Sequence, residues 1–238
     1  MYITQKESDL KDYLDAVGRV ENPLVSIVVP VYQDMSYLHR FLKEMKAQET
    51  LIPYEIIFVN NNDTEGTIFK LRTMGATIVQ EQKQGVNHAR ELGRLTARGS
   101  IILSMDMDTS YPVNYIDMMA LPMLIDENIS LTYCTSIGCQ DVTRPSILIR
   151  LKGWVKVLKN IVCYKPLNQI KSVRAHAAAF RAYDMSAYPT DLTNVSGCDD
   201  GYMALRMYCL GNLHLVKSLI YTTRGSEKRI GKALFPKY

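Results

Sequence analysis

Residues Leu24-Val25-Ser26-Ile27-Val28-Val29-Pro30-Val31 form a nearly unbroken run of apolar and β-branched side chains. Such a run is typical of a strand that is buried on both faces of a parallel sheet. Apolar residues at helical spacing follow over residues 36–48, and a second apolar run covers residues 54–59. The chain therefore passes from a buried strand through a helix to another buried strand.

The same alternation continues as far as residue 110. We expect a helix over residues 67–74, a strand over 76–79, a helix over 86–97 and a strand over 101–105. Strictly alternating strands and helices form βαβ units with right-handed crossovers. The sequence therefore predicts an α/β fold with a doubly wound, mostly parallel sheet.

The remainder of the chain is less regular. On the N-terminal side we expect a short amphipathic helix over residues 8–18. The second half predicts a helix over 112–125 that is interrupted at Pro122, a strand over 130–134, a long basic helix over 145–160, a strand or loop within 172–180, a helix over 200–209, and short strands over 213–216 and 219–222.

The composition excludes several classes of protein. Of the 238 residues, 47% are hydrophobic and 22% are charged, which argues against a disordered or fibrous chain. The longest uninterrupted apolar stretch, residues 118–125, is far shorter than the roughly 20 residues of a transmembrane helix. Residues 1–11 have no signal-peptide apolar core. We therefore expect a cytoplasmic protein.

Charge is distributed unevenly along the chain. Between Asp141 and Asp184 there is no acidic residue, whereas nine residues are basic. They are Arg144, Arg150, Lys152, Lys156, Lys159, Lys165, Lys171, Arg174 and Arg181. Such a stretch is expected to face an anionic partner such as a diphosphate, a membrane surface or a nucleic acid. The alternative is a helix whose cations pair with acids elsewhere, and Trp154 within it is either a core anchor or an interfacial anchor.

Polar side chains follow three of the predicted strands at the points where they end. They are Tyr32, Gln33 and Asp34, then Asn60, Asn61, Asn62 and Asp63, then Asp106 and Asp108. Ligands of doubly wound sheets bind at the carboxyl ends of the strands, so these side chains predict one site. Carboxylates two residues apart, such as Asp106 and Asp108, can hold Mg²⁺ or Mn²⁺. Because this spacing is common by chance, its position after a buried strand carries the argument.

A second acidic pair, Asp199 and Asp200, stands just before the predicted helix over residues 200–209. Capping of the helix N-terminus explains one of these acids but not readily both. An ionised carboxylate at this place can also act as a general base toward an acceptor hydroxyl.

Several motifs, in this order, together resemble family 2 glycosyltransferases. They are Val28-Val29-Pro30-Val31-Tyr32, Phe58-Val59-Asn60-Asn61-Asn62-Asp63, Gly85-Val86-Asn87-His88-Ala89-Arg90, Ser104-Met105-Asp106-Met107-Asp108, Ala179-Phe180-Arg181 and Asp199-Asp200. The resemblance covers about residues 25–224. It implies a glycosyltransferase A fold, a nucleotide-diphosphate sugar as donor, a Mn²⁺ or Mg²⁺ cofactor and inversion at the anomeric centre.

The resemblance also implies a division of the chain. We expect an N-terminal helical arm over residues 1–22 and a single glycosyltransferase domain over 23–238. Within that domain, residues 23–110 form the nucleotide-sugar-binding half, residues 111–223 the acceptor-binding half, and residues 224–238 a basic C-terminal loop.

Residue roles follow from the matched positions. The residues expected to bind the donor are Pro30, Tyr32, Asp34, Asn60, Asn61, Asn62, His88, Arg90, Asp106, Arg224 and Arg229. Asp108, together with Asp106, is expected to bind the metal. Asp200 resembles the catalytic base, with Asp199 beside it. On the acceptor side we expect His176, Ala177 and Ala178, and Trp154 of the basic helix.

Two departures from the family pattern bear on specificity. The family often has aspartate at the position of Asn60, so the donor base is read differently here. The Gln-X-X-Arg-Trp motif of processive members is missing after Asp200, which argues against a polymer synthase.

The sequence thus favours a metal-dependent inverting glycosyltransferase that acts on a glycan or a lipid-linked glycan, with a peripheral contact with an anionic membrane surface as one option. Transfer to a hydroxylated DNA base is an alternative, because the nine basic residues could follow phosphates. A non-catalytic protein that binds nucleotide-sugars is the alternative from another class.

Overall fold

The computed structural model describes residues 5–64, 66–162, 165–183, 187–188 and 199–223. Within them the strands are β1 (Val25–Val31), β2 (Tyr54–Asn60), β3 (Thr77–Gln80), β4 (Ile101–Ser104), β5 (Thr109–Ser110), β6 (Ile129–Gly138), β7 (Ala178–Arg181) and β8 (Asn212–Thr222). The helices are α1 (Gln5–Gly18), α2 (Met35–Lys46), α3 (Thr67–Thr73), α4 (Val86–Thr96), α5 (Tyr115–Ile125), α6 (Ile147–Val162), α7 (Pro166–Ser172) and α8 (Asp199–Leu210), with a 3₁₀ turn η1 (Ala175–Ala177).

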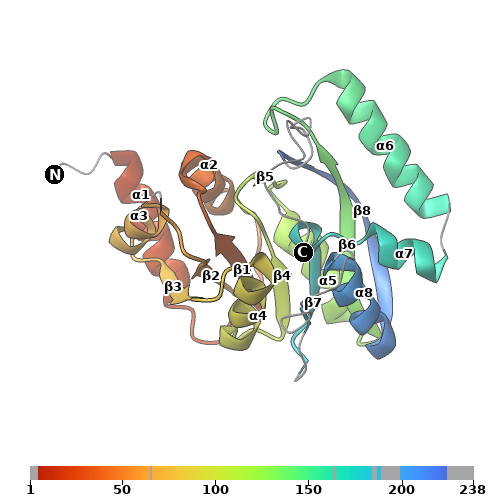
Figure 1. Ribbon diagram of the computed structural model, residues 1–238, viewed down its shortest axis with the longest axis horizontal. Coiled ribbons are helices and arrows are strands. Elements are labelled where there is room, and N and C mark those ends of the chain that lie inside the picture. The colour runs from red at the N-terminus through yellow and green to blue at the C-terminus, as the bar shows by residue number, and fades with distance from the viewer. Residues whose placement is uncertain (1–4, 65, 163–164, 184–186, 189–198, 224–238) are drawn as a thin grey trace.

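The described strands form one sheet in the order β3-β2-β1-β4-β7-β6-β8-β5, with helices on both faces (Figure 1). The first four strands in this order, β3, β2, β1 and β4, are parallel to one another, as the alternating pattern predicts. Val25, Ile27 and Val29 of the central strand β1 are completely buried. This order brings the carboxyl ends of β1, β2 and β4 to one edge of the sheet.

The other half of the sheet is mixed. Strand β7 is antiparallel to both β4 and β6, β8 is parallel to β6, and β5 is antiparallel to β8. The two short strands expected over residues 213–216 and 219–222 are one continuous strand, β8. Tyr133 pairs with Leu215 and Thr135 with Leu219, so a bulge in β8 absorbs the extra residues without ending the strand.

Helix α5 also differs from the expectation, because Pro122 does not interrupt it. A proline inside a helix removes one backbone hydrogen bond. Here Tyr115, Met119 and Met123 are buried along the helix, and their packing offsets that loss. The sequence pattern did not predict α7 or β5, which are among the shortest elements.

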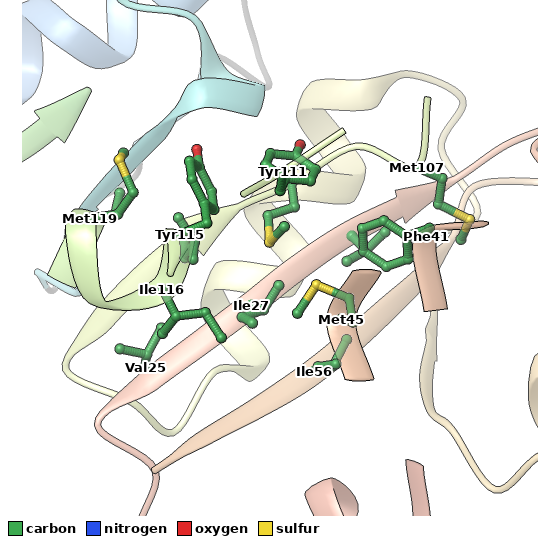
Figure 2. Close-up of a cluster of buried hydrophobic side chains, with 14 of the residues drawn as sticks. Val25, Ile27, Phe41, Met45, Ile56, Met107, Tyr111, Tyr115, Ile116 and Met119 are labelled. Carbon is green, nitrogen blue, oxygen red and sulfur yellow. The ribbon is translucent and has the colours of Figure 1, made fainter. Parts of the chain in front are cut away.

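Each face of the sheet carries its own core. Helices α1, α2 and α5 cover one face, where Figure 2 shows Met45 and Phe41 of α2 and Ile116 of α5 gathered beside Ile27 of β1. Helices α4, α7 and α8 cover the other face. Leu10, Leu14 and Val17 of α1 are buried in the first core. The N-terminal helix is therefore part of the same core and is not a separate arm.

None of the helices in the described ranges has the length and apolar character needed to cross a bilayer.

Replacing Gly99 by alanine should destabilise the fold at β1. A Cβ atom at Gly99 would lie 2.7 Å from the backbone nitrogen of Ser26 and 2.8 Å from the carbonyl carbon of Val25. Since backbone atoms of a buried strand cannot move aside easily, we expect a loss of about 1–3 kcal/mol in the free energy of unfolding, measured by denaturant titration.

Gly18→Ala is the matched control. The nearest atom to a Cβ at Gly18 is the Oγ1 of Thr77 at 3.7 Å, which is an ordinary contact. Equal losses from the two variants would show that the close approach to β1 is not the cause.

Candidate active site

A pocket of about 200 Å³ lies at the carboxyl ends of β1, β2 and β4. It is lined by Pro30, Tyr32, Asp34, Tyr37, Asn61, Gln84, Val86, Asp106, Met107 and Asp108. The pocket thus combines residues from each of the three polar clusters that follow these strands. Val86 and Met107, which belong to the quoted motifs, also line it, as do Tyr37 and Gln84, which no sequence pattern singles out.

Asp106 lies almost fully buried against Arg90 of α4. The Nη2 atom of Arg90 donates to both carboxylate oxygens, at 2.9 Å and 3.1 Å. The backbone amide of Asp106 donates to the hydroxyl of Tyr111 at 2.8 Å, and this hydroxyl donates to the carbonyl of His176 at 3.1 Å. Asp106 is therefore held from both sides, and Arg90 compensates its charge.

Both acidic motifs influence the pKa of Arg90. Burial by itself would lower the pKa of Arg90, but the negative charges of Asp106 and Asp200 and the hydrogen bond to Asp106 outweigh it and raise this pKa. The guanidinium group thus stays charged beside the carboxylate that follows β4.

Asp200 is fixed to the segment just before β7. Its Oδ1 accepts a hydrogen bond from the backbone amide of Ala175 at 3.0 Å. Ala175 begins η1, and His176 follows it. The carboxylate of Asp200 is thereby held beside η1.

Asp108 is held by the end of β8. Thr109 Oγ1 donates to Asp108 Oδ1 at 3.2 Å, and Thr223 Oγ1 donates to Asp108 Oδ2 at 3.0 Å. The backbone amide of Thr223 also donates to the carbonyl of Asp108 at 3.2 Å. These hydroxyl groups fix the orientation of the Asp108 carboxylate, which lines the pocket.

The residues around the pocket fit a hard divalent cation. No group of three or more His, Cys, Asp or Glu side chains within the described residues could hold a metal ion. Mg²⁺ nevertheless needs only one or two carboxylates, because substrate phosphates and water complete its shell. Asp108 suits this role better than Asp106, since the buried guanidinium group of Arg90 already compensates the charge of Asp106.

The sequence profile of glycosyl transferase family 2 matches residues 26–188, which is more than half of the chain. The chain belongs to glycosyl transferase family 2. The match confirms the resemblance drawn from the motifs. No curated protein matches the chain.

Solved structures of other glycosyltransferases resemble the fold. They include residues 1–349 of TarS from S. aureus in complex with UDP (TM-score 0.60, 17% identity, 83% of this chain and 60% of that TarS fragment covered), the mannosyltransferase PcManGT from Pyrobaculum calidifontis with GDP-Man and Mn²⁺ (0.61, 17%, 93% and 66%), and glucosyl-3-phosphoglycerate synthase from Mycobacterium tuberculosis with Mn²⁺, UDP and glucosyl-3-phosphoglycerate (0.59, 16%, 89% and 74%). These likenesses confirm the glycosyltransferase A fold.

The asparagine cluster of this family 2 domain mainly binds its own loops. Asn61 Nδ2 donates to the carbonyl of Lys83 at 2.8 Å, and Asn61 Oδ1 accepts from the amide of Gly85 at 2.9 Å. Asn60 Oδ1 accepts from the amide of Asp63 at 2.9 Å. Asn61 therefore shapes the pocket wall, whereas Asn60 and Asn62 are not among the lining residues.

The loop after β1 has an unfavourable backbone conformation beside the pocket. Gln33 has a φ of 55°, in the left-handed region that non-glycine residues rarely adopt. The amide of Tyr32 donates to Asp34 Oδ2 at 2.8 Å, and the amide of Gln33 donates to Asp63 Oδ1 at 3.3 Å. Asp63 thereby links the loops after β1 and β2, a role that its place among polar residues could have suggested.

Some predicted site residues lie elsewhere. Ala177 and Ala178 are fully buried and pack in the two cores, so the structure assigns their side chains to packing and not to acceptor contact. Trp154 is half exposed on α6 and is not a core anchor. His88 lies on α4 but does not line the pocket.

The side chain of Asp199, and Arg224 and Arg229, lie outside the described residues. Their expected roles stay predictions.

The nine basic residues do not form one surface. Arg181 donates from Nε to the carbonyl of Ile129 at 2.8 Å and from Nη2 to the carbonyls of Met123 and Asp126, at the C-terminal end of α5. There it compensates the helix dipole. None of the nine forms an ion pair with another described residue, so pairing with acids is not their role within those ranges.

Replacing Arg90 by methionine should cost about 3–5 kcal/mol of stability, because it leaves the buried Asp106 carboxylate uncompensated. Adding Asp106→Asn to this variant should restore part of the loss, since the second change removes the uncompensated charge. Thermal and denaturant unfolding measure both effects.

Lys11→Met is the control for Arg90→Met, because it removes an ion pair at an exposed position. Lys11 and Asp15 lie 2.8 Å apart, but their side chains are 40% and 30% exposed. An exposed pair contributes about 1 kcal/mol or less. A loss for Arg90→Met no larger than that of the control would contradict the structural role of the buried pair.

Proposed function

We propose that this protein transfers a sugar from a nucleotide-diphosphate sugar to an acceptor hydroxyl, with inversion at the anomeric centre and with Mn²⁺ or Mg²⁺ as cofactor. One arrangement carries the proposal: Asp106 and Asp108 line the pocket, and Tyr111 joins the backbone of Asp106 to His176, next to the residue that binds Asp200. The chain spans 60% of the TarS fragment 1–349 and 66% of the PcManGT chain, so the activity itself needs a direct test.

The pocket would bind the nucleotide-sugar donor. Asp108 would hold the metal ion, with Thr109 and Thr223 fixing its carboxylate. When bound, the metal ion would supply Lewis-acid stabilisation of charge on the departing diphosphate. The solved structures of PcManGT and of glucosyl-3-phosphoglycerate synthase contain Mn²⁺ together with a nucleotide, which supports this cofactor.

Asp200 provides for the acceptor. Its carboxylate would accept the proton of the attacking hydroxyl group as a general base. The hydrogen bond from Ala175 orients this carboxylate, and His176 lies next in the chain. Tyr111 fixes the carbonyl of His176 to the backbone of Asp106, so donor and acceptor sides are held in one framework.

The favoured acceptor is a glycan or a lipid-linked glycan, reached by a cytoplasmic protein in peripheral contact with an anionic membrane. The side chains exposed on α6 favour it over a hydroxylated DNA base, the second candidate. Leu151, Trp154 and Leu158 are all at least half exposed there. Contacts to phosphates and bases come mainly from polar and basic side chains, so such a helix is poorly suited to following DNA.

A donor screen tests the function. Purified protein with Mn²⁺ is mixed with UDP-, GDP- and dTDP-linked sugars, and release of the nucleoside diphosphate is followed with and without acceptors. Acceptor-stimulated release from one donor is the expected result. Metal-dependent binding of a donor without any release, with lipid-linked and free glycans and hydroxymethylated DNA all present, would identify a non-catalytic nucleotide-sugar-binding protein instead.

A further inference from the structure

Helix α6 exposes an apolar stripe. It lies at the rim of the molecule (Figure 1). Among its residues, only Gly153 and Val157 are buried in the described structure. Seven of its large apolar side chains are between 51% and 80% exposed: Ile147, Leu148, Leu151, Trp154, Val155, Leu158 and Val162. Exposed apolar patches of this kind on a folded domain mark interaction surfaces.

The stripe points away from the body of the protein. Leu148, Leu151, Val155, Leu158 and Val162 recur at alternating spacings of three and four residues, which places them on one face of the helix. Gly153 lies on the opposite face, where a Cβ atom would come within 2.3 Å of Leu219 on β8. The helix therefore packs on the sheet through the face that carries Gly153 and Val157, and it leaves the apolar stripe uncovered in the described structure.

The charges beside the stripe select the partner. Arg150, Lys152 and Lys159 are exposed on the same helix, and no acid occurs between Asp141 and Asp184. Two copies of this helix packed face to face would bring like charges together without an acidic partner. An anionic lipid surface instead complements the cations and accepts the apolar side chains.

A polar pocket adjoins the stripe. A cavity of about 280 Å³ between α6 and α7 is lined by Tyr133, Lys156, Lys159, Asn160, Asn168, Gln169, Lys171 and Ser172. These lining residues supply three ammonium groups and no carboxylate. Gln169 is only 5% exposed, and its Nε2 has no hydrogen-bond partner among the described residues. Ammonium and amide donors together form a suitable receptor for phosphate oxygens.

Lys156 shows that the pocket lacks negative charge. Its Nζ donates to the carbonyl of Ser136 at 2.9 Å. Burial and the nearby charge of Arg174 lower the pKa of Lys156. A bound phosphate would compensate these cations.

We propose that α6 lies in the surface of an anionic bilayer, with its apolar stripe at the boundary of headgroups and acyl chains and a lipid phosphate in the pocket between α6 and α7. Helix α7 ends at Ser172, shortly before Ala175 and His176 on the acceptor side. The surface would thus present a lipid-linked acceptor to Asp200. This consequence rests on the proposed function, whereas lipid binding itself does not.

Vesicle co-sedimentation of the full chain tests the proposal. We expect binding to vesicles that contain phosphatidylglycerol and at least tenfold weaker binding to phosphatidylcholine alone. Leu151→Gln with Leu158→Gln should weaken binding at least tenfold, because exposed side chains are changed without affecting the core. Lys159→Gln with Lys171→Gln should weaken binding about 5- to 30-fold, at roughly 1 kcal/mol for each lysine.

Lys43→Gln with Lys46→Gln, on α2, is the charge-matched control and should change binding little. Unchanged binding in the leucine pair would overturn the proposal, and so would equal binding to both kinds of vesicle. Sedimentation velocity in solution tests whether a second copy of the chain covers the apolar stripe instead. A dimer that the leucine pair dissociates, or lysine-dependent binding of a DNA duplex or of inorganic phosphate without vesicle binding, would also overturn it.

Donor turnover measured on the same preparations separates the two proposals. Vesicle binding without any turnover would contradict the proposed function and leave the lipid surface established.

Discussion

Replacing Asp200 by asparagine is expected to lower turnover by about a hundredfold or more while donor affinity stays nearly unchanged. General-base catalysis typically contributes ~10²–10⁴ in rate, and an amide cannot accept the proton of the acceptor hydroxyl. Asparagine keeps an oxygen that can accept from the amide of Ala175, so the hydrogen bond at the start of α8 is preserved. Release of nucleoside diphosphate gives the rate, and calorimetry gives the donor affinity.

Asp199→Asn is the control at the neighbouring position. It should lower turnover less than Asp200→Asn does, because the family resemblance gives Asp199 a supporting role beside the catalytic base. Mild and equal losses from the two variants would favour helix capping over proton transfer. Unfolding curves of both variants should coincide with that of the unchanged protein, since a lost helix cap would lower stability by about 1 kcal/mol.

Replacing Asp108 by asparagine should abolish the dependence of donor binding on Mn²⁺. Loss of a partner that only orients a metal ligand typically weakens metal binding about 10- to 100-fold, and loss of the ligand itself should cost at least as much. The asparagine oxygen can still accept from one of the two threonine hydroxyl groups, and the other hydroxyl can accept from the asparagine NH₂ group, so the contact between β5 and β8 should survive. Calorimetric titration of the nucleotide-sugar with and without Mn²⁺ measures the effect.

Glu127→Gln removes the same charge at an exposed position after α5 and should leave the titration unchanged. Metal-dependent affinity that is the same in Asp108→Asn and in this control would place the cation elsewhere. Asp106→Asn should in contrast lower stability, because it removes the partner of the buried Arg90.

Local patterns in the sequence determined the first half of the fold. The apolar run over residues 24–31 became β1, and the alternation to residue 110 became the parallel strands and their helices. Strands buried on both faces carry their signal within a few consecutive residues, so it can be seen without knowledge of their neighbours. For the same reason, the position of Asp106 and Asp108 directly after such a strand is enough to predict that they lie at the sheet edge.

Partners distant in the chain could not be derived in this way. Thr223 reaches Asp108 across 115 positions, and the contact exists because β8 pairs with β5 in the second half of the sheet. Arg90 was expected to contact the donor, yet it is buried against Asp106. Hydrophobic periodicity specifies which residues share a face, but not which strand will lie beside another.

The sequence by itself therefore determined the family, the α/β class and the acidic residues that the pocket and α8 carry. Only the tertiary structure decided which face of α6 packs. Its leucines and lysines predict an amphipathic helix, but they do not indicate whether the apolar stripe faces the sheet or the solvent. The close contact of Gly153 with Leu219 places the stripe on the solvent side. The tertiary structure also decided the role of Arg181. The run of nine basic residues predicts that it faces an anionic partner, but it donates to a carbonyl group at the end of α5. Side-chain chemistry is local, whereas the surface on which it acts depends on how the elements pack.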